Sequence, residues 1–137
     1  MILLDTHVLI WSLQDEPRLG PEARKLLDEQ ILADGLMVSA ITPWEIALLA
    51  KRSRIVLGVD TGRWIEEALA IPGIVLAELD PKIAVDSVNL PGDFPNDPAD
   101  RIIVATARHH KVPLLTVDRA ILNYGAAGHV SAIDAKA

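Results

Sequence analysis

Two spacings of apolar residues alternate along the chain. Short continuous apolar runs bounded by turn residues predict buried strands, and apolar residues at three- and four-residue intervals predict helices. We expect strands at residues 2–4, 36–40, from 73, at 113–117 and, weakly, at 130–133. We expect helices at residues 7–13, 23–31, 43–53, 64–69, from 81, at 98–110 and, as a turn or short helix, after 118. Repeated strand-then-helix units predict an α/β fold, a mostly parallel sheet of four to five strands with helices on both faces.

Composition narrows this picture to one aliphatic domain. The chain has 137 residues, of which 50% are apolar and only 4% aromatic. A chain of this length fits a single domain, here residues 1–137. A net charge of −6 argues against a large basic surface for nucleic acid, so any contact of that kind must be local. The absence of cysteine excludes a disulfide framework and a thiolate metal site.

The amino-terminal residues carry no targeting signal. Met1 is followed directly by Ile2-Leu3-Leu4-Asp5, without a basic segment or a cleavage pattern. No apolar stretch approaches the length of a membrane span. We therefore expect a cytoplasmic protein that has no membrane partner.

Four acidic residues occupy one kind of position, just after an apolar run or in the first turn of the following helix. They are Asp5, Glu45, Asp100 and Asp118. In an open parallel sheet such positions gather beyond the carboxyl ends of the strands, where these folds bind ligands. Carboxylates brought together there repel each other unless a cation lies between them. Oxygen ligands suit Mg²⁺ or Mn²⁺, so the pattern predicts a divalent metal centre and phosphate chemistry.

Taken singly, each acid also has a structural explanation as a helix cap. Asp5 and Asp118 can each cap the helix or turn that follows its strand. Thr42-Pro43-Trp44-Glu45 matches a capping box with Thr42 as N-cap, and Asp97 can cap a helix that has Asp100 at its third position. The case for function is joint, because ordinary caps are spread around a fold whereas these fall at one sheet edge.

Basic and histidine residues give weaker indications. Lys51, Arg52 and Arg54 form the densest basic cluster. They could guide a phosphate backbone, but a solvated helix end is the favoured interpretation. Arg101 could pair with a carboxylate or with a phosphate, and the sequence does not decide between them. No histidine is assigned a catalytic role.

With these residues in view, the whole chain resembles the PIN domains, specifically the VapC-type toxin ribonucleases of bacterial toxin–antitoxin pairs. The matching segments are Leu4-Asp5-Thr6-His7-Val8-Leu9-Ile10-Trp11, residues 39–45 with the helix that follows, Asp97-Pro98-Ala99-Asp100-Arg101, and Thr116-Val117-Asp118. Four acids in this order and strand context make a fairly specific signal, over nearly the full length.

The resemblance implies a catalytic metal pocket and two macromolecular partners. The implied metal ligands and catalytic residues are Asp5, Glu45, Asp100 and Asp118. Thr6 and Thr116 match polar positions that support such a pocket, and Asp97 is an additional carboxylate that could replace or assist Asp118. The implied activity is Mg²⁺- or Mn²⁺-dependent hydrolysis of RNA phosphodiester bonds. A VapB-type antitoxin protein and a second copy of the chain are the implied partners.

Three alternatives remain open. A haloacid-type phosphatase also uses an aspartate after its first strand, but it normally needs a second aspartate two positions on, where this chain has His7. A phosphoacceptor receiver domain needs paired acids after the first strand and a late lysine, which are missing at the expected places. The third alternative is a catalytically degenerate PIN-like module that only binds a protein partner.

Overall fold

The structure, a computed structural model, describes residues 1–137 and has five strands and seven helices. All strands are parallel and lie in one sheet in the order β3-β2-β1-β4-β5, which confirms the predicted α/β fold with five strands. The strands are β1 Ile2–Leu4, β2 Leu36–Ser39, β3 Ile74–Ala77, β4 Leu114–Thr116 and β5 Ala132–Asp134. The helices are α1 Thr6–Leu13, α2 Pro21–Leu32, α3 Thr42–Lys51, α4 Thr61–Leu69, α5 Pro81–Val88, α6 Pro98–His110 and α7 Arg119–Ala126.

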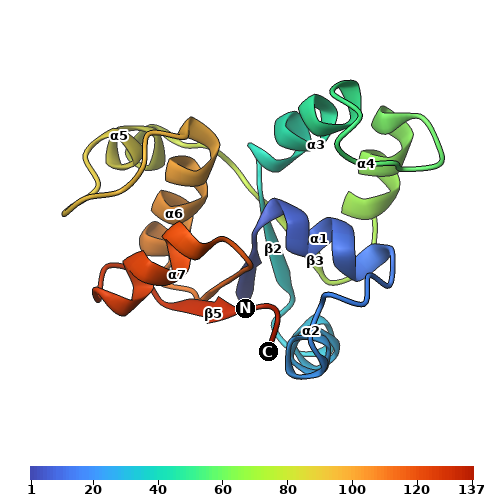
Figure 1. The fold of residues 1–137 in the computed structure, drawn as a ribbon, viewed down its shortest axis with the longest axis horizontal. Coiled ribbons are helices and arrows are strands. Elements are labelled where there is room, and N and C mark those ends of the chain that lie inside the picture. Colours follow the sequence, from blue (N-terminus) through green and yellow to red (C-terminus); the bar gives the residue numbers. More distant parts are fainter.

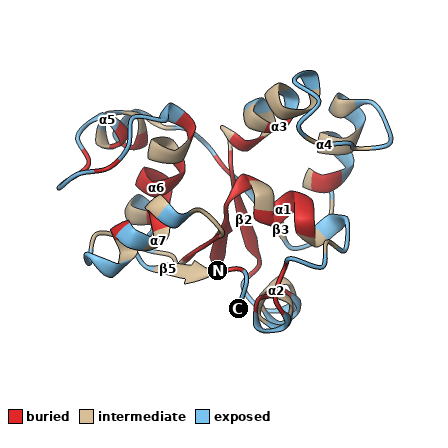
Figure 2. Ribbon diagram, in the orientation of Figure 1, coloured by how far each residue is buried: buried red, intermediate tan, exposed pale blue.

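Helices cover both faces of the sheet. Helices α5, α6 and α7 lie on one side and α1, α2, α3 and α4 on the other (Figure 1). Because successive side chains of a strand point to opposite faces, Ile2 and Leu4 join one core cluster and Leu3 joins the other. The three central strands β2, β1 and β4 are therefore buried on both faces, whereas the edge strands β3 and β5 are partly exposed (Figure 2).

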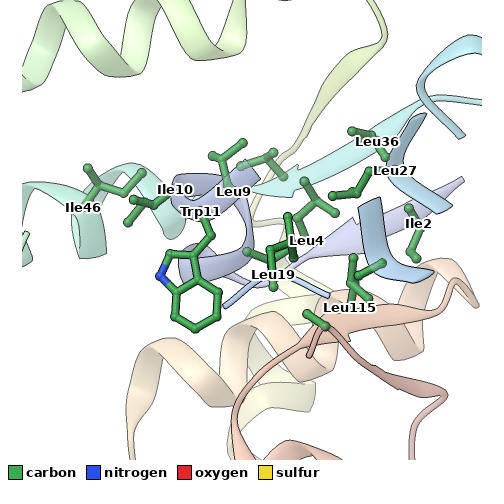
Figure 3. Packing of buried hydrophobic residues seen from close by; sticks show 14 residues of the cluster. Ile2, Leu4, Leu9, Ile10, Trp11, Leu19, Leu27, Leu36, Ile46 and Leu115 are labelled. Atoms are coloured by element: carbon green, nitrogen blue, oxygen red, sulfur yellow. The ribbon is translucent and has the colours of Figure 1, made fainter. Parts of the chain in front are cut away.

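The core beneath α1 is aliphatic, as the composition predicted. Leu4 and Leu115 of the sheet pack with Leu9 of α1 and Leu27 of α2 (Figure 3). Trp11 is the one buried tryptophan and is 8% exposed. The Arg18 guanidinium covers its ring at 4.5 Å from the centroid.

The order of the strands creates a switch point at the centre of the sheet. After β1 the chain adds β2 and β3 on one side, then returns to add β4 and β5 on the other. Ligand crevices of open α/β sheets form at such points, beyond the carboxyl ends of the strands. Asp5 directly follows the central strand β1, so it lies at this edge.

Several predicted boundaries were wrong by one to three residues. Helix α3 begins at Thr42 and ends at Lys51, rather than running from 43 to 53. The last strand begins at Ala132 rather than at residue 130. The turn or short helix expected after Asp118 is confirmed as a helix of 8 residues, α7. None of the helices has the length and apolarity that crossing a bilayer requires.

The first turn of α2 is completed by the other end of the chain. Gly20 is the N-cap residue and offers no side chain to the turn. The backbone oxygen of Ala137 instead accepts hydrogen bonds from the amides of Glu22 and Ala23, at 3.1 and 3.2 Å. A Cβ atom on Gly20 would lie only 1.9 Å from that oxygen. Glycine is needed here for space rather than for its backbone angles.

Candidate metal centre

Asp5 is fixed by hydrogen bonds to both carboxylate oxygens. It is the N-cap of α1, and its Oδ1 accepts from the amide of Thr6 at 2.8 Å. Its Oδ2 accepts from the Thr116 hydroxyl, on the neighbouring strand β4, at 2.6 Å. Burial raises the pKa of Asp5, whose side chain is almost fully enclosed, although both hydrogen bonds oppose that shift. Each oxygen retains one lone-pair direction for another ligand.

Glu45 reaches the same edge from α3. Thr6 Oγ1 donates to Glu45 Oε1 at 2.5 Å and lies 3.0 Å from the Thr42 hydroxyl oxygen. Burial, together with repulsion from Asp5, Asp97 and Asp118, raises the pKa of Glu45 to about 7. The Thr6 hydroxyl, which lowers this pKa, only partly offsets these effects.

The capping box predicted around Glu45 was wrong. Thr42 lies inside α3, the N-cap residue is Ile41, and no side chain caps this helix. The hydroxyl of Thr42 lies against Thr6 instead of the helix amides. Glu45 is therefore not explained by capping, because its carboxylate interacts with Thr6 across the sheet edge.

Asp100 lies in the first turn of α6 with Asp97 as the N-cap. The Asp97 carboxylate accepts from the Asp100 amide at 3.1 Å, which confirms this predicted cap. Burial, together with repulsion from the carboxylates of Asp5, Asp97, Asp118 and Glu45, raises the pKa of Asp100 to about 8. The electrostatic influence of four other acids on one carboxylate means that all five share one region.

Asp118 completes this group after β4. As predicted, it is the N-cap of α7, and its Oδ1 accepts from the amides of Ala120 and Ile121 at 2.8 and 3.2 Å. The hydroxyl oxygen of Thr116 accepts from the Asp118 amide at 2.9 Å. Thr116 therefore links Asp118 to Asp5, as Thr6 links Glu45 to Asp5.

The donor set favours a hydrated cation over one held only by protein. No three acidic or histidine side chains converge closely enough to form a ready-made metal cage. Mg²⁺, however, keeps several waters and needs only one or two carboxylates, supplemented by substrate phosphate. The available donors are all carboxylate oxygens, and a cation among them would relieve the repulsion that raises the pKa values of Glu45 and Asp100. The chemistry of this site fits Mg²⁺ or Mn²⁺.

Arg101 has a role that the sequence did not reveal. Its guanidinium donates to the backbone oxygens of Ser87, Val88, Phe94 and Pro95, at 2.7–3.2 Å. Of the two partners that the sequence left open, the carboxylate is not used, because Arg101 forms no ion pair and its donors bond to backbone oxygens. Arg101 thus ties the end of α5 and the loop at 91–96 to the start of α6, beside Asp100. Backbone carbonyls carry no sequence signal, so this role could not have been predicted.

A model of the PIN domain family matches residues 2–127. The chain belongs to the PIN-domain family. It is 36% identical over 123 residues to Ribonuclease VapC22 of Mycobacterium tuberculosis, and the match covers 90% of this chain and 91% of that protein. The family membership predicted from the four acids and their strand context is thereby confirmed.

Solved structures share the PIN fold over nearly the whole chain. VapBC2 from Rickettsia felis, bound to a DNA fragment from its promoter, aligns with a TM-score of 0.69 and 13% identity, covering 98% of both chains. FitAcB from Neisseria gonorrhoeae aligns with a TM-score of 0.61 and 26% identity, covering 97% of this chain and 96% of that one. VapBC-1 from nontypeable Haemophilus influenzae aligns with a TM-score of 0.67 and 16% identity over 100% of both chains. The similarity to the first and third of these concerns the fold alone.

Proposed function

We propose that this PIN-domain protein is a metal-dependent endoribonuclease that hydrolyses RNA phosphodiester bonds and is the toxin of a VapBC-type toxin–antitoxin pair. Its similarity to a protein named as a VapC ribonuclease, over 90% of the chain, supports the activity. The observation that carries the proposal is the group of carboxylates at the carboxyl ends of the strands, which we call the acidic edge: Asp5, Glu45, Asp97, Asp100 and Asp118. Burial and crowding by neighbouring carboxylates raise the pKa of Asp100 to about 8, and a divalent cation at that edge would remove the repulsion.

In this proposal Asp5 and Asp100 are the principal metal ligands and catalytic residues, with Glu45 and Asp118 completing the set. Thr6 and Thr116 orient the carboxylates of Glu45 and Asp5 through their hydroxyl groups. A bound Mg²⁺ or Mn²⁺ would supply the Lewis acidity that activates a water and offsets negative charge in the transition state.

Further roles follow from the remaining contacts of the site. Glu45 is the carboxylate that would accept the proton of the attacking water, because it lies in the same group of acids and is held by the Thr6 hydroxyl. Asp97 supports the site by fixing the first turn of α6, where Asp100 lies. Asp97 thus assists the ligand set through Asp100 rather than in place of Asp118.

The test compares RNA cleavage by the purified chain in Mg²⁺, in Mn²⁺ and in EDTA. We expect cleavage with either metal and none with the chelator. Asp5→Asn and Asp100→Asn should fold, as circular dichroism would show, yet leave RNA intact. Glu66→Gln, which neutralises an exposed acid of α4 outside the site, is the matched control and should cleave normally. Metal-dependent cleavage by both site variants would refute the proposal, and a folded chain that never cleaves would support the degenerate PIN-like module instead.

The partners of the proposal are a VapB-type antitoxin protein and a second copy of this chain. Two of the solved structures with this fold are VapBC proteins. Val85 and Val88 of α5 are 61% and 73% exposed, and apolar side chains of this kind are suited to an interface. Light scattering of the isolated chain measures the dimer, and co-expression with the adjacent open reading frame followed by co-purification tests the antitoxin.

A further inference from the structure

A groove begins at Glu45 and follows α3 away from the acidic edge. It lies between α3 and the start of α6, with a volume of about 330 Å³. Glu45, Leu48, Leu49 and Arg52 line it at the spacing of one helix face. The helix rises about 1.5 Å per residue, so Arg52 lies about 10 Å along the axis from Glu45. The groove therefore leads from the proposed catalytic site to the basic end of α3.

Trp44 lies at the acidic end of this groove and is 55% exposed. It is the most exposed of the chain's three tryptophans, and its ring has no aromatic partner in the protein. An unpaired indole beside a phosphodiester-cleaving site suits the face of a nucleobase, because every base can stack on an aromatic ring.

Arg52 and Arg54 lie at the other end of the groove and are exposed. Neither forms an ion pair or a side-chain hydrogen bond, and neither does the neighbouring Lys51. Five other basic residues are paired with acids: Arg18, Arg24, Lys25, Arg63 and Arg108. The remaining unpaired cations, such as Lys82 and Lys136, lie apart in the sequence, whereas Lys51, Arg52 and Arg54 are clustered at one helix end. In a chain with a net charge of −6, this cluster is a local exception. Guanidinium groups without an internal partner are available to phosphate oxygens.

We propose that single-stranded RNA runs along this groove, with a base stacked on Trp44 and neighbouring phosphates held by Arg52 and Arg54. This inference rests on the proposed ribonuclease function. It adds the path of the RNA strand along the protein surface and the residues that hold it. Arg52 and Arg54 together with the exposed indole of Trp44 favour an RNA strand over an acidic protein segment. RNA carries both a base that can stack on the indole and phosphates that can bind the guanidinium groups. The cluster expected from the sequence to be only a solvated helix end becomes part of the substrate path.

Binding is separated from cleavage by measuring it in EDTA. The probe is a fluorescent single-stranded oligoribonucleotide, titrated with the full-length chain while anisotropy is recorded over a range of salt concentrations. Trp44→Ala should weaken binding about 10-fold, the loss expected for one stacked base, and Trp44→Phe should restore much of it. The salt dependence of the Trp44→Ala variant should match that of the wild type, since no charge changes.

The double variant R52A/R54A tests the phosphate contacts. The slope of log affinity against log salt should become shallower by about 1.4, at about 0.7 for each lost contact to a single strand. The double variant K82A/K136A removes the same charge from two exposed lysines outside the groove and should leave the slope unchanged. Equal slopes for wild type and R52A/R54A, or equal affinities for wild type and Trp44→Ala, would overturn the groove proposal.

These outcomes are independent of catalysis. A wild-type chain that binds RNA through Trp44 and the arginines but never cleaves it in Mg²⁺ would refute the proposed function and leave the groove in place. If the groove variants cleaved RNA normally and bound it with unchanged affinity, the groove proposal alone would be refuted. If the groove variants lost antitoxin co-purification but kept wild-type RNA binding, the groove would be a protein-docking surface, and the inference would equally be overturned.

Discussion

The metal-free protein should lose stability as pH rises from about 4 to about 8. In the folded chain the pKa of Asp100 is about 8 and that of Glu45 about 7, against ordinary values of 3.8 and 4.5. Between these limits the folded state holds protons that the unfolded chain has already released, so the free energy of unfolding falls as pH rises. The stabilisation is thus complete below the ordinary pKa values and is lost as each group ionises within the fold.

The size of this effect follows from the two shifts. A pKa change of one unit corresponds to about 1.4 kcal/mol, so the Asp100 shift alone would amount to about 6 kcal/mol without solvent screening. Both carboxylates are partly exposed to water, which weakens such interactions. The two groups also titrate as a coupled system. We expect a combined loss on the order of 3 kcal/mol, a large fraction of the total stability of a domain.

Urea unfolding in EDTA at several pH values, followed by circular dichroism, measures this loss. Asp100→Asn cannot ionise, so it should have a smaller pH slope than the wild type and exceed its stability at pH 8. Glu66→Gln should keep the wild-type slope. Mg²⁺ or Mn²⁺ should stabilise the wild type more at pH 8 than at pH 5, because protons compete for the same oxygens. Equal slopes for wild type and Asp100→Asn would show that the carboxylates do not repel each other, and the argument for a metal at this edge would fail.

Three further predictions concern single contacts and products. Thr116→Val removes the hydroxyl that holds Asp5 Oδ2 and should lower the rate of RNA cleavage about 10-fold or more at saturating metal. The control Thr106→Val removes a buried hydroxyl that bonds only within α6 and should leave the rate unchanged. Equal cleavage rates for the two variants would argue against a positioning role for Thr116. Gly20→Ala should lower the melting temperature, and Gly20→Ser should do so despite being a better N-cap, because any Cβ collides with Ala137; an unchanged melting temperature would mean that the carboxyl end of the chain is loose. Since the proposed nucleophile is water, cleaved RNA should carry no 2′,3′-cyclic phosphate, and its detection by mass spectrometry would indicate attack by the ribose hydroxyl instead.

The sequence predicted the fold well where the periodicity was strong. Strand β1 and helix α6 were located correctly because an apolar run and a 3.6-residue pattern leave few alternatives. The N-cap residues of α1 and α6, Asp5 and Asp97, were also recognised, since an N-cap contact is local in sequence. Helix ends such as that of α3 were less certain, because fraying and tertiary contacts decide them.

Long-range features of the site could not be predicted. The hydroxyl of Thr6 was expected to support the pocket, but its choice of Glu45 as partner joins residues 39 positions apart. The capping box at Thr42 was wrong for a related reason, because the Thr42 hydroxyl also lies against the Thr6 hydroxyl rather than the helix amides. The exposure of Trp44 and the unpaired state of Arg52 depend on which neighbours the fold provides, and no local pattern encodes that.

The anchoring of the acidic edge is uneven, and this has a dynamic consequence. Asp5 extends from a central strand that is hydrogen-bonded on both sides, whereas the loop before α6 is held mainly by the guanidinium of Arg101, which bonds to the backbone oxygens of Phe94 and Pro95. Amide hydrogen exchange should therefore find the protons of β1 among the slowest and those around residues 91–100 among the fastest. A partner protein that displaces the loop at residues 91–96 would move Asp100 away from Asp5 while the sheet stays intact. Inhibition would then require no global unfolding.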